Sequence, residues 1–188
     1  DGPGRGVRGL FHERWPWRVD AEGRTVLDVI PGWLRWGIGV VLVAIAGAAL
    51  AIRAVGHDPA EWHVDPFAAE RSGKPNDYLV APEGTTAADP DRTLEPLDEP
   101  PQSVMERLHA IATGEPRTEV VAGSPQEGHV TYVQRSLVFG FPDYISVRAM
   151  ETEGGTALAV FSRARFGHSD LGVNRERVER WLEALGSG

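Results

Sequence analysis

The segment GHSDLG at residues 167–172 places a histidine, a serine and an aspartate side by side, the three residue types of a hydrolytic triad. Neighbouring side chains point away from one another, so His168, Ser169 and Asp170 cannot align as base, nucleophile and orienting acid. The nucleophile turn of the α/β-hydrolase fold needs the spacing G-x-S-x-G, and this segment is one residue too long. A small hydrolase is therefore a weaker interpretation than an accessory subunit or a ligand-binding domain, which are considered below. We assign no catalytic residue.

The same segment is better explained as the link between a strand and a helix. A helix is expected over residues 175–185, because apolar residues recur there at helical spacing. Asn174 is a residue type favoured at the N-cap of such a helix, and Gly172 permits the chain to reverse before it. In this interpretation Asp170 pairs with a nearby arginine, and His168 is an ordinary surface or packing residue.

A second group of residues has the chemistry of an anion site. The group combines arginines of successive expected strands with aspartates near strand ends, namely Arg135, Arg148, Arg163, Arg165, Asp143 and Asp170. Guanidinium groups form paired hydrogen bonds with phosphate and carboxylate, so arginines that share one sheet face could hold an anionic or lipid-like ligand. The alternative is a solvated sheet face crossed by salt bridges.

A metal site is weakly indicated at most. His57, Asp58, His63 and Asp65 lie close in sequence, but their spacing matches no zinc signature. The chain has no cysteine, which excludes disulfides, thiolate nucleophiles and cysteine-ligated zinc. We expect no metal and no cofactor.

One uncharged stretch decides the class of protein. WGIGVVLVAIAGAALAI at residues 36–52 contains no charged residue and is flanked by Arg35 and Arg53. At about 1.5 Å per residue it spans roughly 25 Å, slightly less than a hydrocarbon core of about 30 Å, and snorkelling of Arg53 permits extension to Gly56. We predict a single transmembrane helix over residues 33–56. A signal peptide is disfavoured, because the stretch lies deep in the chain and no small-residue cleavage site follows it.

The arginines predict the orientation of this helix. Six arginines precede the apolar stretch, whereas the next basic residue after Arg53 is Arg71. The positive-inside rule therefore places the N-terminus in the cytoplasm and the C-terminal part outside it. In a Gram-negative bacterium this means a helix in the inner membrane and a C-terminal part in the periplasm. Beyond Arg53 the chain has twelve basic and 22 acidic residues, a net charge of −10, which argues against nucleic acid as a partner.

We divide the chain into four parts. Residues 1–32 form a cytoplasmic arm, either with a small hairpin or as a tail whose tryptophans meet the lipid interface. The transmembrane helix follows, and residues 57–102 form an extended juxtamembrane segment and an acidic, proline-rich linker, with one short strand near residues 78–80. Residues 103–186 form the domain outside the cytoplasm. The side chains expected to contact lipid or a partner are Trp15, Trp17, Trp33, Trp36, Phe139 and Phe141.

The last part has the pattern of an α+β domain. Ser103 and Glu106 have the spacing of a capping box, and a helix follows to Gly114. Strands are expected within residues 117–123, 128–136, 143–151 and 156–164, with alternation of apolar residues clearest in the third. Short links predict an antiparallel sheet in the order α-β-β-β-β-α, with the helices on one face.

The segment LVFGF at residues 137–141 is too apolar for an ordinary exposed turn. It is either core at a strand end or a patch that contacts lipid or a partner protein.

Several stretches resemble the bacterial and plastid family known as domain of unknown function 1499. The resemblance spans about residues 62–185 and rests on WHVDP, KPNDYLVAPEG, VTYVQRS, FGFPDYISVR and, above all, SRARFGHSDLGVNRERVERWL. It implies a membrane-anchored protein, and because the family has no established activity it transfers no catalytic residue. The arginine-bearing arm at residues 1–32 is not part of the family pattern and indicates a specialised role.

These observations favour a non-catalytic, single-pass membrane protein that acts as an accessory or assembly subunit of a larger membrane protein complex. The expected partners are the lipid bilayer and a membrane protein. The alternative is a periplasmic domain that binds an anionic or lipid-like ligand.

Overall fold

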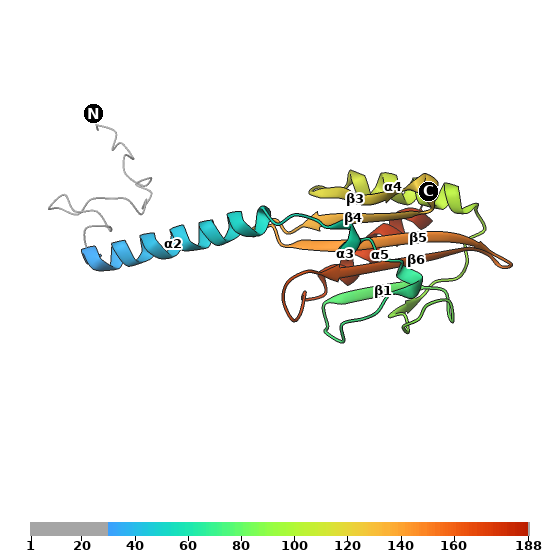
Figure 1. Cartoon of the computed structure of the whole chain (residues 1–188), viewed down its shortest axis with the longest axis horizontal. Helices are drawn as coiled ribbons and strands as arrows, with labels where there is room; N and C mark the ends of the chain where they lie inside the picture. Colours follow the sequence, from blue (N-terminus) through green and yellow to red (C-terminus); the bar gives the residue numbers. More distant parts are fainter. Residues whose placement is uncertain (1–29, 188) are drawn as a thin grey trace, which may run out of the picture. The chain divides into compact units, whose positions relative to one another are not determined.

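The computed structural model describes residues 30–187, which fall into two units divided between Ala48 and Ala49 (Figure 1). The predictions for the arm, its hairpin, Trp15 and Trp17 lie outside the described residues.

The helix α2 spans Gly32–Arg53 and has no buried residue. Its 22 residues have a mean hydropathy of 2.0 in their most apolar window, and their rise of roughly 33 Å matches a hydrocarbon core of about 30 Å. Trp33 and Trp36 are 76% and 79% exposed. The helix is therefore long and apolar enough to cross a membrane.

The second unit is built on a six-stranded sheet, which confirms the predicted α+β class. The strand order is β2-β1-β6-β5-β4-β3, and every neighbouring pair is antiparallel except β1 and β2. The strands are β1 (Asp77–Ala81), β2 (Arg92–Thr93), β3 (Thr118–Ser124), β4 (His129–Arg135), β5 (Pro142–Thr152) and β6 (Gly155–Ala164). The sheet is thus mixed. It contains the four strands expected within residues 103–186, the short strand expected near residues 78–80, and β2, which was not expected.

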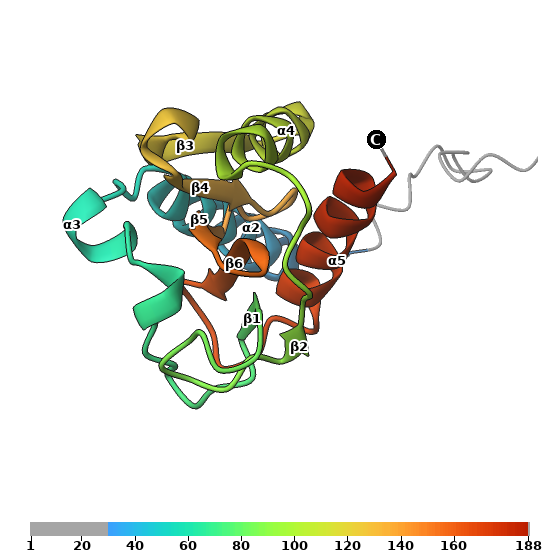
Figure 2. The same ribbon diagram turned by 90° about the vertical axis from the view of Figure 1, so that its right-hand side faces the viewer.

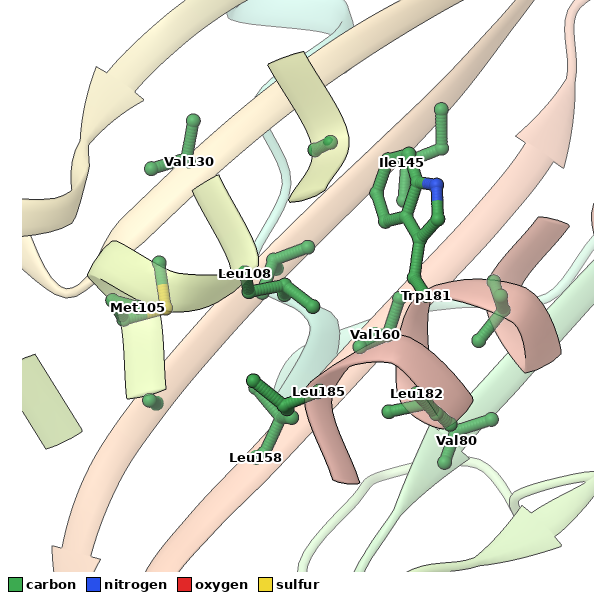
Figure 3. Close-up of a cluster of buried hydrophobic side chains, with 14 of the residues drawn as sticks. Val80, Met105, Leu108, Val130, Ile145, Leu158, Val160, Trp181, Leu182 and Leu185 are labelled. Carbon is green, nitrogen blue, oxygen red and sulfur yellow. The ribbon is translucent and has the colours of Figure 1, made fainter. Parts of the chain in front are cut away.

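Two helices cover one face of the sheet, as predicted. They are α4 (Pro101–Gly114) and α5 (Val173–Gly186). The apolar stripe of α5, which includes Trp181 and Leu182, packs with Leu108 of α4 against Ile145 and Val160 of the sheet (Figure 3). The alternation of apolar residues along the strands therefore produces one continuous core on this face.

The juxtamembrane segment covers the other face of the sheet (Figure 2). It contains the short helix α3 (Pro59–Trp62) and the 3₁₀ turn η1 (Pro66–Ala68). Trp62 packs in a second apolar cluster with Val133 and Tyr144 of the sheet. Residues 57–72 are therefore a packed layer, where the sequence suggested an extended connection.

Both predicted helix caps are wrong. α4 starts at Pro101, and the Ser103 hydroxyl donates to Glu99 instead of capping the helix. α5 starts at Val173, one residue before the expected N-cap, and its N-cap is Gly172. The carboxylate of Asp170 satisfies the free N–H groups at this end, accepting from Gly172 (3.1 Å) and Asn174 (2.7 Å).

Candidate functional site

Three of the four predicted arginines lie on the sheet face that the juxtamembrane segment covers. The register places Arg163 opposite Tyr144, Arg135 opposite Pro142, and Arg148 opposite His129. Their neighbours Ile145 and Val147 point to the helix face, so the arginines point away from it. Arg148 lies four residues along β5 from Tyr144, roughly 13 Å away, so the arginines form two separate groups.

Tyr144 is the centre of the first group. Its ring stacks on Trp62 with a centroid distance of 3.9 Å, and its hydroxyl lies 2.8 Å from Nδ1 of His57 and 3.1 Å from Nη1 of Arg165. Nε2 of His57 lies 2.9 Å from Nη2 of Arg135. Because a guanidinium only donates, Nε2 must accept, and the proton of the neutral imidazole is on Nδ1 and points to Tyr144. Burial and the charge of Arg135 lower the pKa of His57, which favours this neutral form.

Arg135 binds the end of α2. Its guanidinium donates to the carbonyl oxygens of Ile52 (3.4 Å) and Val55 (3.2 Å), and to that of Gly140 (3.0 Å). The carbonyls at a helix C-terminus lack intrahelical partners and carry partial negative charge, so a cation stabilises them. In return, Arg53 donates to the carbonyl oxygen of Val138 at 2.8 Å. The last turn of α2 and the loop between β4 and β5 are therefore cross-linked by two guanidinium groups.

Arg163 and Arg165 lie over Trp62, with guanidinium carbons 5.1 and 5.4 Å from its ring centroid. Arg163 donates to the carbonyl oxygen of Trp62 at 3.0 Å, while its Nη1 is buried and has no hydrogen-bond partner among residues 30–187. Burial lowers the pKa of Arg163 to about 10, so the group remains a cation at neutral pH. Arg165 donates to the carbonyl oxygen of Gly56 at 2.9 Å.

Several arginines among residues 30–187 form no salt bridge with a carboxylate, unlike most of the others. Within the described part of the chain, five arginines near the start of β3, the end of β4 and the end of β6 form no salt bridge, and we call them the arginine end: Arg53, Arg117, Arg135, Arg163 and Arg165. Elsewhere salt bridges are made by Arg71, Arg92, Arg107, Arg148, Arg177 and Arg180. Guanidinium groups without a salt bridge are therefore gathered at one end of an acidic domain, where Asp77 and Glu61 act on Arg163 only at longer range.

The loop between β4 and β5 adds exposed apolar side chains to this end. Leu137 and Val138 are 71% and 67% exposed. Phe139, Phe141 and Phe166 are also exposed and form a row, with ring centroids 5.7 and 6.0 Å apart. We use the name apolar loop for these five side chains, four from the loop between β4 and β5 and Phe166 from the segment after β6. The segment 137–141 is thus a surface patch.

A groove of about 670 Å³ opens beside the arginine end. Arg163, Arg165 and Phe166 line one part of it, and Lys74 and Glu70 lie at another. Its mixed charge indicates no single ligand class.

The second group surrounds Arg148 and is fully paired. Arg148 forms a salt bridge with Asp65, which also caps η1 through the N–H of Phe67. Beside it, His63 stacks on His129 at a centroid distance of 3.8 Å, and His63 contacts Thr131 at 2.9 Å. These contacts fasten the juxtamembrane segment to the sheet.

The four residues considered for a metal site do not converge. His57 faces Tyr144 and His63 faces Thr131, while Asp58 caps α3. In residues 30–187 no group of three or more histidine, aspartate or glutamate side chains is arranged to hold a metal ion.

Neither of the two predicted aspartates pairs with the arginine end, although Asp143 lies at the same end of the sheet, between Gln134 and Ala164, on the helix face. Asp170 caps α5, and Asp143 forms a salt bridge of 2.7 Å with Arg177 on the helix face. Arg177 is 2% exposed and also donates to Gln134, Ser162 and Asn174. The sequence did not predict this buried network, because an arginine among polar residues at the start of a helix is expected to be exposed.

The GHSDLG segment forms no triad. The Ser169 hydroxyl accepts from the N–H of Leu171, and no hydrogen bond joins Ser169, His168 and Asp170 side chains within the region described. His168 is exposed.

One comparison with known proteins confirms the predicted resemblance. A family model described as protein of unknown function, DUF1499, matches residues 68–185. A crystal structure of protein MLL2253 from Mesorhizobium loti is similar at 13% sequence identity and a TM-score of 0.40, over 59% of this chain and 94% of that one. A comparison with proteins of curated description found no match. The family match spans more than half of the chain, and the chain therefore belongs to the DUF1499 family.

Proposed function

We propose that the chain is a non-catalytic, single-pass membrane protein that serves as an accessory or assembly subunit of a larger membrane protein complex. In this proposal α2 crosses a bacterial inner membrane, the N-terminus is cytoplasmic, and the α+β domain lies in the periplasm. The observation that carries the proposal is that α2 has no buried residue despite its apolar composition.

The cost of leaving α2 in water supports the membrane span. Ten large apolar side chains of α2 are exposed: Trp33, Leu34, Trp36, Ile38, Val40, Val41, Leu42, Val43, Ile45 and Leu50. At about 1.5–3 kcal/mol for each, covering them is worth on the order of 15–30 kcal/mol. A folded domain is stable by only about 5–15 kcal/mol, so exposure on this scale must be relieved by lipid or by a partner.

The subunit role is supported by the apolar loop, because contiguous exposed apolar side chains mark contacts with lipid or protein. The alternative, binding of a soluble anionic ligand, is favoured by the unpaired arginines beside the groove. The residues that line the groove include four acids, Glu61, Asp65, Glu70 and Asp77, which makes a dedicated soluble-anion site the weaker candidate.

Extraction and copurification test the proposal. Membranes of the native host are washed with alkaline carbonate and then solubilised in a mild detergent, and the chain is isolated with whatever accompanies it. We expect the chain to stay in the carbonate pellet and to copurify with a membrane protein in fixed stoichiometry. Release by carbonate would refute the span, and a monomeric chain in detergent would refute the subunit role.

A further inference from the structure

We infer that the arginine end and the apolar loop seat the α+β domain on the headgroups of anionic phospholipids. This inference rests on the proposed membrane span of α2 and names the surface that the domain itself contacts.

The apolar loop is joined to the end of α2 by hydrogen bonds. Arg53 is the last residue of α2 and donates to the carbonyl oxygen of Val138 at 2.8 Å, while Arg135 donates to carbonyl oxygens of Ile52 and Val55. If α2 ends at the lipid interface, atoms bonded directly to its last turn lie within a few ångströms of that interface. The apolar loop therefore adjoins the part of α2 that we propose to lie at the lipid interface.

The arginine end differs in charge from the rest of the domain. Beyond Arg53 the chain has a net charge of −10, which anionic lipids repel. The arginine end brings five guanidinium groups to one place, and among the described residues none of them forms a salt bridge with a carboxylate. Phosphodiester groups are acceptors that match guanidinium, and about 1 kcal/mol is gained for each basic residue held near an anionic surface.

Apolar side chains and cations lie next to each other on this surface. Phe139, Phe141 and Phe166 stand beside these cations, with Leu137 and Val138 still more exposed. Aromatic and aliphatic side chains flanked by arginine are typical of surfaces that enter the headgroup layer, because the apolar part reaches the acyl boundary and the cation stays at the phosphates. A soluble anion would use the charges but would leave the apolar loop in water.

A fluorescent probe in the loop tests the inference. The chain has no cysteine, so Leu137→Cys gives a single labelling site on the full-length protein. Glu153→Cys, in the turn between β5 and β6 at the opposite end of those strands, is the matched control. Both labelled proteins are reconstituted in vesicles of phosphatidylcholine with and without phosphatidylglycerol, and quenching by headgroup nitroxide lipids is measured.

We expect strong quenching at position 137 and none at 153, with more quenching when phosphatidylglycerol is present. Arg117 is exposed and makes one hydrogen bond through its side chain. On anionic vesicles, Arg117→Gln should lower the ratio of domains in contact with the headgroups to domains away from them by about fivefold. On vesicles of phosphatidylcholine alone this ratio should not change. Near-ultraviolet circular dichroism verifies that this variant is folded.

Three results would overturn the inference. They are equal quenching at both positions, no effect of lipid charge, and saturable binding of inorganic phosphate that displaces the loop from the vesicles. Failure of the span itself is distinguished by flotation: a chain that does not float with vesicles refutes the proposed function, whereas a floating chain with an unquenched loop refutes only the seating.

Discussion

Replacing Arg177 by methionine should destabilise the domain more than any other single charge removal on α5. Arg177 is 2% exposed, and four of its hydrogen bonds, of 2.6–3.1 Å, end on Gln134, Ser162, Asn174 and Asp143. Methionine fills much of the volume but supplies no donor and no charge. Asp143, whose side chain is 13% exposed, then loses its cation.

The expected loss follows from burial. Removing one partner of a buried ion pair costs about 3–5 kcal/mol, because the remaining charge is left without compensation. For a domain of this size that corresponds to a fall of roughly 10–20 °C in melting temperature. The same reasoning predicts partial recovery in Arg177→Met combined with Asp143→Asn, since the second change removes the stranded charge.

Thermal unfolding of the full chain in detergent, followed by near-ultraviolet circular dichroism, measures the effect. Arg180→Met is the matched control on the same helix, because Arg180 is 54% exposed and its contact with Glu115 is 3.3 Å long. That control should lose at most about 1 kcal/mol. Equal melting temperatures for the two single variants would show that burial of Arg177 does not determine its contribution.

Two further predictions concern pH and backbone strain. Burial and Arg135 lower the pKa of His57, and burial and His63 lower the pKa of His129, so both histidines bind a proton more tightly in the unfolded chain. The free energy of unfolding should therefore fall as the pH drops below 6.5. His129→Gln should make this pH dependence weaker, as measured by denaturant titrations at several pH values. A steeper curve for the variant would contradict the assignment. Gly123→Ala should lower the free energy of unfolding by about 2 kcal/mol or more, because φ is +78° and a Cβ would overlap the carbonyl oxygen of His129. The control Gly73→Ala has a similar φ of +71° but open space around the new Cβ, and it should lower the free energy by about 1 kcal/mol. Equal unfolding midpoints for the two variants would refute the clash.

The local pattern of the sequence predicted the sheet well. The alternation along residues 143–151 assigns Ile145 and Val147 to the core, because side chains of a strand alternate between faces whatever surrounds them. The short strand near residues 78–80 is confirmed as β1. β2 was missed, since its two residues are held by pairing with β1 rather than by any pattern of their own.

Contacts between distant residues defeated the predictions of the caps and of the polar core. Asn174 has the right type for an N-cap, but its side chain is engaged by Ser162 at 2.6 Å and by Arg177 at 2.7 Å, and Asp170 caps the helix in its place. The sequence also indicated arginines on successive strands. It could not indicate that Arg148 meets a carboxylate of the juxtamembrane segment while Arg135 and Arg163 meet none, because that depends on how residues 57–72 fold over the sheet.

Cysteine labelling tests the membrane span of α2 most directly. Single cysteines replace Val43 in the middle of α2, Ser187 at the exposed end of α5, and Gly2 in the N-terminal part of the chain. A membrane-impermeant maleimide is added to cells with a permeable outer membrane. We predict immediate labelling at 187, labelling at position 2 only after the inner membrane is broken, and labelling at 43 only in denaturant. Labelling of position 43 in the folded protein, or of both ends in intact cells, would contradict the account.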